Sequence, residues 1–314
     1  FYANAQSQNF FTQSIFLQTV LIFILAVLTQ DFILGQKFDD WAFKSLKFDV
    51  IEPERSKTIL NLTRLIAFSL LSLAGLYIIF TASVESASET AEKEAAQTAS
   101  ENESRNEEQP AISFDSLSEK EIRELFEEYQ AGLDEKQLSY YDALREEEAL
   151  FAFQSRASFV GDSITLGASD IIYTFSPQSV VTANVGLLFS DAIANISQLK
   201  ENGQLNPMVF IALGSNGDFS EEQLKEMIDT IGPDHEIYLI TTHVNRPWRD
   251  SANSVYSNYV ERTEAGHVRL IDFNGYYQNH PDSQSWLAED GVHFNETGML
   301  EWVSYIVKNV YHGE

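Results

Sequence analysis

The chain of 314 residues carries 47 acidic and 20 basic side chains, which gives a formal net charge of -27 at pH 7. This balance argues against nucleic acid as a partner, because Lys and Arg are the side chains that neutralise phosphates. The sequence has no Cys, which excludes a disulfide framework and a thiolate metal site. The length allows one or two domains.

Two charge-free runs stand near the start of the chain. The first charged residue is Asp31, and a second charge-free run extends from Leu65 to Val84. Because about 20 mostly apolar residues cross a bilayer, the runs predict transmembrane helices over about 14–34 and 65–84. The alternative of a signal peptide plus a buried core helix is disfavoured, since the first run is long and lacks a basic n-region.

Charge asymmetry around these runs predicts a topology. Positive residues stay on the cytoplasmic side, so the loop between the spans is expected inside the cell and everything after Val84 outside. We therefore expect a multi-pass cell-membrane protein, and the lack of Cys suits a Gram-positive envelope. Because the chain begins with Phe1, we also expect it to be a fragment of a longer protein. The basic residues between the predicted spans are Lys37, Lys44, Lys47, Arg55, Lys57 and Arg64.

An acidic linker is predicted over residues 85–150. Its first part, to about Pro110, consists mainly of Ala, Ser, Thr, Glu, Gln and Asn, a composition typical of a disordered spacer. The part that follows has helical spacing, with Ser118 and Glu121 placed as a capping box. A second helix is expected over 135–150, so this part is interpreted as a helical stalk.

From residue 151 to the end, short apolar runs alternate with amphipathic stretches, which predicts a three-layer α/β/α domain with a five-stranded parallel sheet. In such sheets the functional site lies at the carboxyl ends of the strands. The predicted strands are 158–161, 180–183, 208–213, 237–241 and 268–271. The predicted helices are 164–174, 189–200, 220–231, 253–265 and 297–310.

Three motifs fall at those carboxyl ends or in the last loop. Ser163, in Gly-Asp-Ser after the first strand, stands at a helix N-terminus that favours a developing oxyanion. Asn216 follows the third strand and offers an amide donor. Asp290 and His293 precede the last helix and can act as orienting carboxylate and general base. Each motif alone also fits an ordinary turn, but together they predict a serine nucleophile site.

These motifs resemble those of the SGNH (GDSL-like) hydrolase superfamily, which implies a flavodoxin-like fold. The resemblance implies that Ser163, Asp290 and His293 are catalytic, and that Asn216 and Gly186 form the oxyanion hole. It covers about half of the chain. No metal or other cofactor is implied.

The order of segments further resembles the OatA-type peptidoglycan O-acetyltransferases, in which an acyltransferase-3 membrane domain precedes an extracellular SGNH domain. Residues 1–84 would then be the end of that membrane domain. The acyltransferase-3 family relies on a His in an early membrane helix, and this sequence departs from that pattern because it has no His before His235. Gly217, the residue that follows Asn216, also agrees with this group. Trp248 and Arg249 could bind a sugar or simply cover the sheet edge.

This resemblance implies that an acetyl group, delivered across the membrane and ultimately from acetyl-CoA, passes through Ser163 to the C6 hydroxyl of muramic acid in peptidoglycan. Membrane lipid would be a further partner. Two alternatives stay open. The domain could be an extracellular esterase that transfers the acetyl group to water, or a glycan-binding module with an inactive site.

Overall fold

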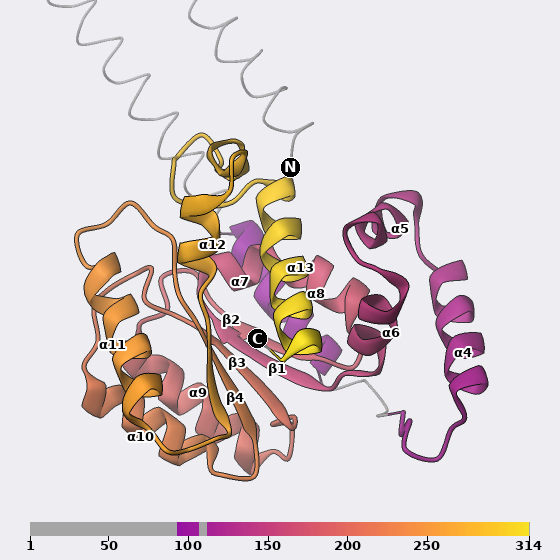
Figure 1. Ribbon diagram of the computed structural model, residues 1–314, viewed down its shortest axis with the longest axis horizontal. Helices are drawn as coiled ribbons and strands as arrows, with labels where there is room; N and C mark the ends of the chain where they lie inside the picture. The colour runs from indigo at the N-terminus through magenta and orange to yellow at the C-terminus, as the bar shows by residue number, and fades with distance from the viewer. Residues whose placement is uncertain (1–92, 107–111, 314) are drawn as a thin grey trace, which may run out of the picture. The chain divides into compact units, whose positions relative to one another are not determined.

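The computed structural model describes residues 93–106 and 112–313 (Figure 1). The chain divides into two compact units, Phe1–Ala91 and Glu92–Glu314, and the description below concerns the second. The predicted transmembrane helices lie outside the described residues. Within the described ranges, no helix is both long enough and apolar enough to cross a membrane.

A parallel five-stranded sheet in the order β2-β1-β3-β4-β5 forms the centre of this unit. All five predicted strands are present, each within one residue of its expected ends. The order places β1, β3 and β4 in the interior of the sheet, with β2 and β5 at its two edges. The strands are β1 Ala157–Gly161, β2 Val180–Ala183, β3 Met208–Ala212, β4 Glu236–Ile240 and β5 Val268–Ile271.

Both faces of the sheet are apolar, as expected for parallel strands covered on two sides. On one face Phe159 stacks on Phe210 at 4.5 Å between ring centroids, and Phe210 stacks on Tyr238 at 4.9 Å. The opposite face carries fully buried aliphatic side chains such as Val160 and Ile211. Alternate residues of each strand therefore feed two separate hydrophobic clusters.

Helices cover each face. The aromatic face packs under α7 Ser163–Gly167, α8 Ser169–Phe175, α12 Phe273–Asn279 and α13 Glu296–His312. The aliphatic face packs under α9 Phe189–Glu201, α10 Glu221–Ile231 and α11 Arg249–Arg262. The single helix predicted over 164–174 is two helices that meet at Ala168, and the short α12 was not predicted.

The segment interpreted as a stalk packs against the sheet domain. Its elements are α4 Glu119–Ala131, α5 Glu135–Tyr140, η2 Tyr141–Ala143 and α6 Glu146–Gln154. The predicted capping box at Ser118 is present. The helix predicted over 135–150 is interrupted, because Leu144 is extended. The hydroxyl groups of Tyr129 and Tyr141 donate to the carbonyl of Thr174 at 3.2 and 2.5 Å, so these helices belong to the same compact unit.

The prediction of a disordered spacer was wrong for residues 93–106, which form a helix. The side chain of Asn106 donates to Val181 O at 3.1 Å and accepts from Val181 N at 3.3 Å. Val181 lies on β2, an edge strand, whose outer backbone groups need partners. Arg105 also lies over the ring of Tyr173, 4.1 Å from its centroid. These polar contacts hold the helix, together with Ala95 and Ala99, which pack against the hydrophobic core. A composition poor in large apolar residues gave no sign of this docking.

Candidate active site

The turn from β1 into α7 holds Ser163. Asp162 is the N-cap of α7, and its carboxylate accepts from Ile164 N at 3.0 Å. A Cβ at Gly161 would collide with the side chain of Thr165 and come within 3.0 Å of Ala212 O. Glycine is therefore required here by close packing, and the half-buried Ser163 is held at the carboxyl end of an interior strand.

Asp162 is a buried carboxylate, 1% exposed, that the sequence did not single out. Ser215, in the loop after β3, donates its hydroxyl to the second carboxylate oxygen. Burial raises the pKa of Asp162, against the hydrogen bonds from Ser215 and Ile164 that favour the charged form. The contact joins the turn that carries Ser163 to the loop that carries Asn216.

The structure brings Ser163, His293 and Asp290 together, although Ser163 and His293 are 130 residues apart. His293 Nε2 lies 3.0 Å from Ser163 Oγ, and His293 Nδ1 lies 2.5 Å from Asp290 Oδ2. An ionised carboxylate only accepts, so Nδ1 carries the proton and the Nε2 lone pair faces the serine hydroxyl. This tautomer can accept the proton of Ser163.

The loop that carries Asp290 and His293 is held by local hydrogen bonds. Asp290 Oδ1 accepts from Val292 N at 2.9 Å and from His293 N at 3.0 Å, across a left-handed Gly291 with φ 65°. Burial alone would raise the pKa of Asp290. The hydrogen bonds from the His293 ring and from the two backbone N–H groups outweigh it and lower the pKa. Asp290 is therefore a carboxylate at neutral pH.

The two predicted oxyanion donors lie in loops on either side of β1 in the sheet. Gly186 lies between β2 and α9 with φ 72°, and Asn216 follows β3. The Asn216 amide donates to Leu187 O at 3.4 Å, which joins these two loops. The two candidates therefore belong to neighbouring loops at the carboxyl edge of the sheet, where Ser163 also lies.

Trp248 and Arg249 are half-buried residues at the start of α11. The indole N–H of Trp248 donates to Ser215 O at 3.3 Å, which fixes it beside the residue preceding Asn216. Arg249 Nε pairs with Asp250 at 2.7 Å. These contacts place both residues at the carboxyl edge and leave their role in sugar binding as a prediction.

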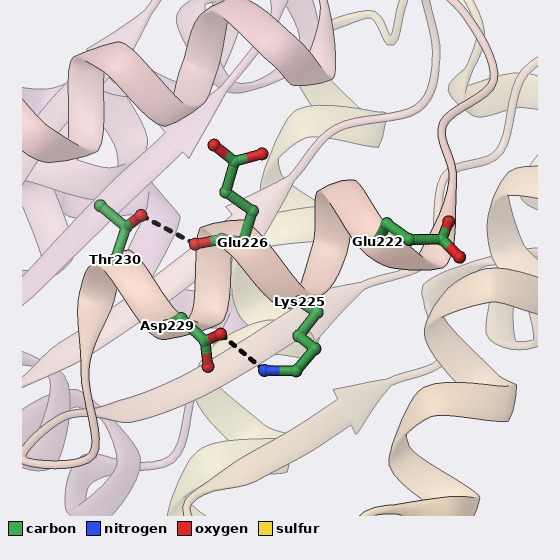
Figure 2. Close-up of a pocket in the computed structure, with 5 residues that line it drawn as sticks. All are labelled: Glu222, Lys225, Glu226, Asp229 and Thr230. Atoms are coloured by element: carbon green, nitrogen blue, oxygen red, sulfur yellow. Dashed lines mark hydrogen bonds and ion pairs between the residues drawn. The ribbon is translucent and has the colours of Figure 1, made fainter.

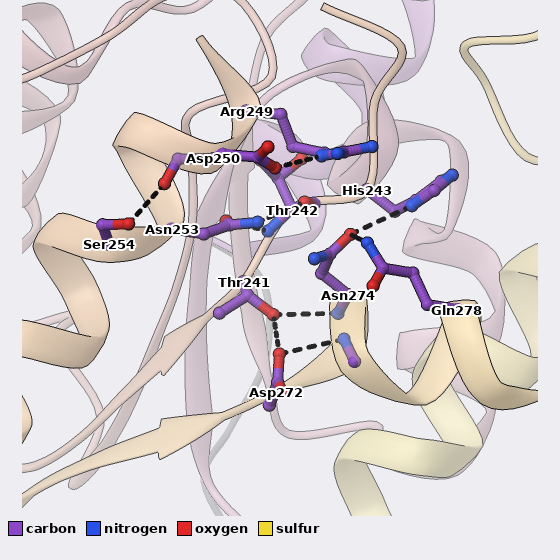
Figure 3. Close-up of polar contacts among 11 residues, drawn as sticks. Thr241, Thr242, His243, Arg249, Asp250, Asn253, Ser254, Asp272, Asn274 and Gln278 are labelled. Carbon is purple, nitrogen blue, oxygen red and sulfur yellow. Dashed lines mark hydrogen bonds and ion pairs between the residues drawn. The ribbon is translucent and has the colours of Figure 1, made fainter.

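Two further groups of polar residues lie outside these motifs, one on α10 and one in the loop after β4. A surface hollow on α10 is lined by that helix alone, and two of its charged side chains, Lys225 and Asp229, pair with each other (Figure 2). Among the described residues no cluster of His, Cys, Asp and Glu could hold a metal ion. His243, three residues after β4, does lie at the carboxyl edge (Figure 3). Its position after a predicted strand was the signal that could have identified it.

Comparison with known proteins finds a family match and several relatives. Residues 162–306 match the family described as GDSL-like Lipase/Acylhydrolase. The peptidoglycan O-acetyltransferase OatA of Listeria monocytogenes is 29% identical over 147 residues, 47% of this chain and 22% of that protein. The O-acetyltransferase OatA of Staphylococcus aureus strain NCTC 8325 is 27% identical over 158 residues, 50% of this chain and 25% of that protein. This chain thus spans about a quarter of the length of these curated relatives.

Among solved structures, the C-terminal catalytic domain of Streptococcus pneumoniae OatA is similar with a TM-score of 0.43 and 19% identity, covering 50% of this chain and 91% of that domain. The family match runs from the turn after β1 into α13, and it contains Ser163, Asn216, Asp290 and His293. The C-terminal region of this chain is therefore a GDSL/SGNH domain with OatA O-acetyltransferases among its curated relatives.

Proposed function

We propose that the chain is a serine-dependent O-acyltransferase that moves an acetyl group through a Ser163 acyl-enzyme to a hydroxyl of a cell-wall glycan. The observation that carries the proposal is the 3.0 Å contact between Ser163 Oγ and His293 Nε2, with Asp290 on the other ring nitrogen. This arrangement supports the proposed roles of Ser163 as nucleophile, His293 as base and Asp290 as orienting carboxylate.

In the first half-reaction, His293 takes the proton of Ser163 as Oγ attacks the acetyl carbonyl of the donor. The Asn216 amide and the backbone N–H of Gly186 would stabilise the negative oxygen that forms. The tetrahedral intermediate then collapses, and the departing group of the donor receives the proton from His293. Ser163 is left as an acetyl ester, and His293 is again neutral.

In the second half-reaction, His293 takes a proton from the acceptor hydroxyl, whose oxygen attacks the acetyl ester. Collapse returns the proton from His293 to Ser163 and releases the acetylated acceptor. The same steps with water as acceptor give an esterase, which is the second candidate function because the matching family is described as lipase and acylhydrolase. Exclusion of water would decide between the two outcomes.

The choice of a glycan acceptor rests on the relatives, which are named as O-acetyltransferases and in one case as a peptidoglycan O-acetyltransferase. The acceptor would be peptidoglycan, at the muramic acid C6 hydroxyl. The proposed topology places the GDSL/SGNH domain outside the cell, anchored by two spans over about 14–34 and 65–84. The acetyl group would then reach Ser163 from the membrane side, ultimately from acetyl-CoA.

The test uses the full chain with p-nitrophenyl acetate as donor and a muramic-acid-containing peptidoglycan oligosaccharide as acceptor. Mass spectrometry follows the sugar, and Ser163→Ala is the matched control. Acetylated sugar that depends on Ser163 supports the transferase. Release of acetate that depends on Ser163, with the sugar unmodified, supports the esterase. Turnover unaffected by Ser163→Ala would contradict both the transferase and the esterase. Glycan binding without any turnover would support the third alternative, a glycan-binding module with an inactive site.

A further inference from the structure

The loop after β4 carries a histidine whose ring is held from two sides. His243 Nδ1 lies 3.0 Å from Asn274 Oδ1, and that same oxygen accepts from Gln278 Nε2 at 3.4 Å (Figure 3). Beneath the ring, Tyr277 stacks at 3.6 Å between centroids and 20° between planes. Because Tyr277 is fully buried, the imidazole has a fixed platform and a fixed orientation.

These contacts fix the tautomer of His243. An amide oxygen can only accept, so Nδ1 carries the proton and Nε2 keeps its lone pair in the neutral ring. Burial lowers the pKa of His243, and the nearby positive charge of Arg249 acts in the same direction against the hydrogen bond to Asn274. Nε2 has no hydrogen bond within the described residues and is not among their buried unpaired atoms. It is available to accept from a ligand.

The loop itself is fixed to its neighbours. Thr241 donates to the carboxylate of Asp272 at 2.9 Å and accepts from Asn274 N at 2.8 Å. The amide of Asn253, on α11, makes two hydrogen bonds of 2.9 Å with the backbone of Thr242. Because the backbone of this loop is fixed, the side chain of His243 loses little conformational entropy when it binds a ligand.

Two further contacts connect this loop to the candidate active site. Tyr277, under His243, packs against Phe294 at 6.2 Å between centroids, and Phe294 follows His293. At the other end of the loop, Trp248 donates to Ser215, the residue before Asn216. Arg249 is close enough for its positive charge to act on His243, and its Nε lies 2.7 Å from Asp250 Oδ1 (Figure 3).

We propose that His243, positioned by Asn274 and Tyr277, forms with Arg249 a subsite for the acceptor glycan. His243 Nε2 accepts a hydrogen bond from a sugar hydroxyl, and the Arg249 guanidinium donates to a neighbouring carbonyl or carboxylate oxygen of the same glycan. The inference rests on the proposed function, and it assigns the β4 and β5 ends of the sheet to the acceptor. The β1 and β3 ends are left to the reacting acetyl group.

The test measures the ratio of acetyl transfer to acetate release in the full chain, with p-nitrophenyl acetate as donor. The two acceptors are chitotetraose, which carries no carboxylate, and a muramic-acid-containing oligosaccharide, which does. His243→Phe keeps a ring on Tyr277 and removes both nitrogens, and the ratio should fall about tenfold for both glycans through a raised KM for the glycan. Arg249→Gln should lower the ratio more for the carboxylate-bearing glycan.

The control is His267→Phe, which changes a histidine just before β5, at the opposite edge of the sheet, and should leave the ratio at the wild-type value. A general loss of structure in His243→Phe would lower both rates together and leave their ratio intact. A ratio within about twofold of wild type for both glycans would overturn the subsite.

If the wild-type protein transfers to neither glycan, the proposed function fails separately. Calorimetric titration of the same two glycans into the full chain then decides the subsite. Glycan affinity that falls in His243→Phe but not in His267→Phe supports it, whereas equal or undetectable affinity in wild type and His243→Phe overturns it.

Discussion

The nucleophile and the base of the candidate site are held in two different ways. Ser163 follows an interior strand, beside the buried Asp162 and a glycine whose surroundings leave no room for a Cβ. Asp290 and His293 have side chains 50% and 44% exposed, and a Cβ at Gly291 would meet nothing within 4 Å. The core positions Ser163, whereas local hydrogen bonds position His293. Substitutions that disturb the packing around Ser163 should therefore cost more stability than substitutions in the loop that carries Asp290 and His293.

The largest effect is expected from removing either reacting group. Ser163→Ala and His293→Ala should each reduce acetyl-ester turnover by about 10⁶-fold, because the proton transfer between them is lost. The double variant should be no worse than either single one, since the two groups act as a unit. Steady-state kinetics would check this, and additive losses in the double variant would contradict a shared role.

Asp290→Asn isolates the role of the carboxylate in orienting His293. An Asn can still accept from Val292 N and His293 N, so the loop should keep its shape. Its NH₂ group would face His293 Nδ1 and disfavour the tautomer that takes the serine proton. We expect turnover to fall about 10⁴-fold and the melting temperature to fall only slightly, because the ion pair of Asp290 and His293 is about half exposed. A large fall in melting temperature would show that the base loop is coupled to the core.

A matched pair of glycine substitutions tests the comparison directly. Gly161→Ala would force a Cβ against Thr165 and Ala212 O, and should lower the free energy of unfolding by about 3 kcal/mol. Gly291→Ala meets no atom and should cost only about 1 kcal/mol, from its left-handed φ of 65°. Urea unfolding would measure both, and equal costs would contradict the difference between the two regions.

The smallest effect concerns a second carboxylate–histidine pair, in which the carboxylate is buried. Glu148 accepts from Arg145 N at 2.8 Å and Arg145 Nη2 at 2.7 Å, and lies 3.1 Å from His312 Nε2. Burial would raise the pKa of Glu148, but these partners outweigh it and lower the pKa. Glu148→Gln should therefore cost about 1 kcal/mol of stability at pH 7.

The sign of that effect sets its pH dependence. A carboxyl group whose pKa is lower in the folded protein stabilises it above the unfolded-state pKa of about 4.3, and this contribution is lost as pH falls through the folded-state pKa. The melting temperatures of wild type and Glu148→Gln should therefore converge once the pH falls below the lowered folded-state pKa of Glu148. A difference that persists in acid would mean that packing, and not charge, is what Gln disturbs.

The sequence by itself determined the sheet and the chemistry of its edge. Apolar runs of strand length, separated by amphipathic stretches, predicted every strand to within one residue. Since the carboxyl ends of parallel strands meet at the same edge, the strand pattern alone was enough to place Ser163 and Asn216 together. The Asp290-x-x-His293 spacing implied a base next to its orienting carboxylate, and the two side chains are in contact.

Only the tertiary structure decided which polar residues find partners far away in the chain. The docking of Asn106 on the edge strand β2, the buried contact of Asp162 with Ser215, and the pairing of His243 with Asn274 join segments 75, 53 and 31 residues apart. Hydrophobic periodicity reports which face of an element is buried, because that depends on neighbours along the same helix or strand. It carries no information about a single hydrogen bond between loops, so these contacts had to be read from the folded chain.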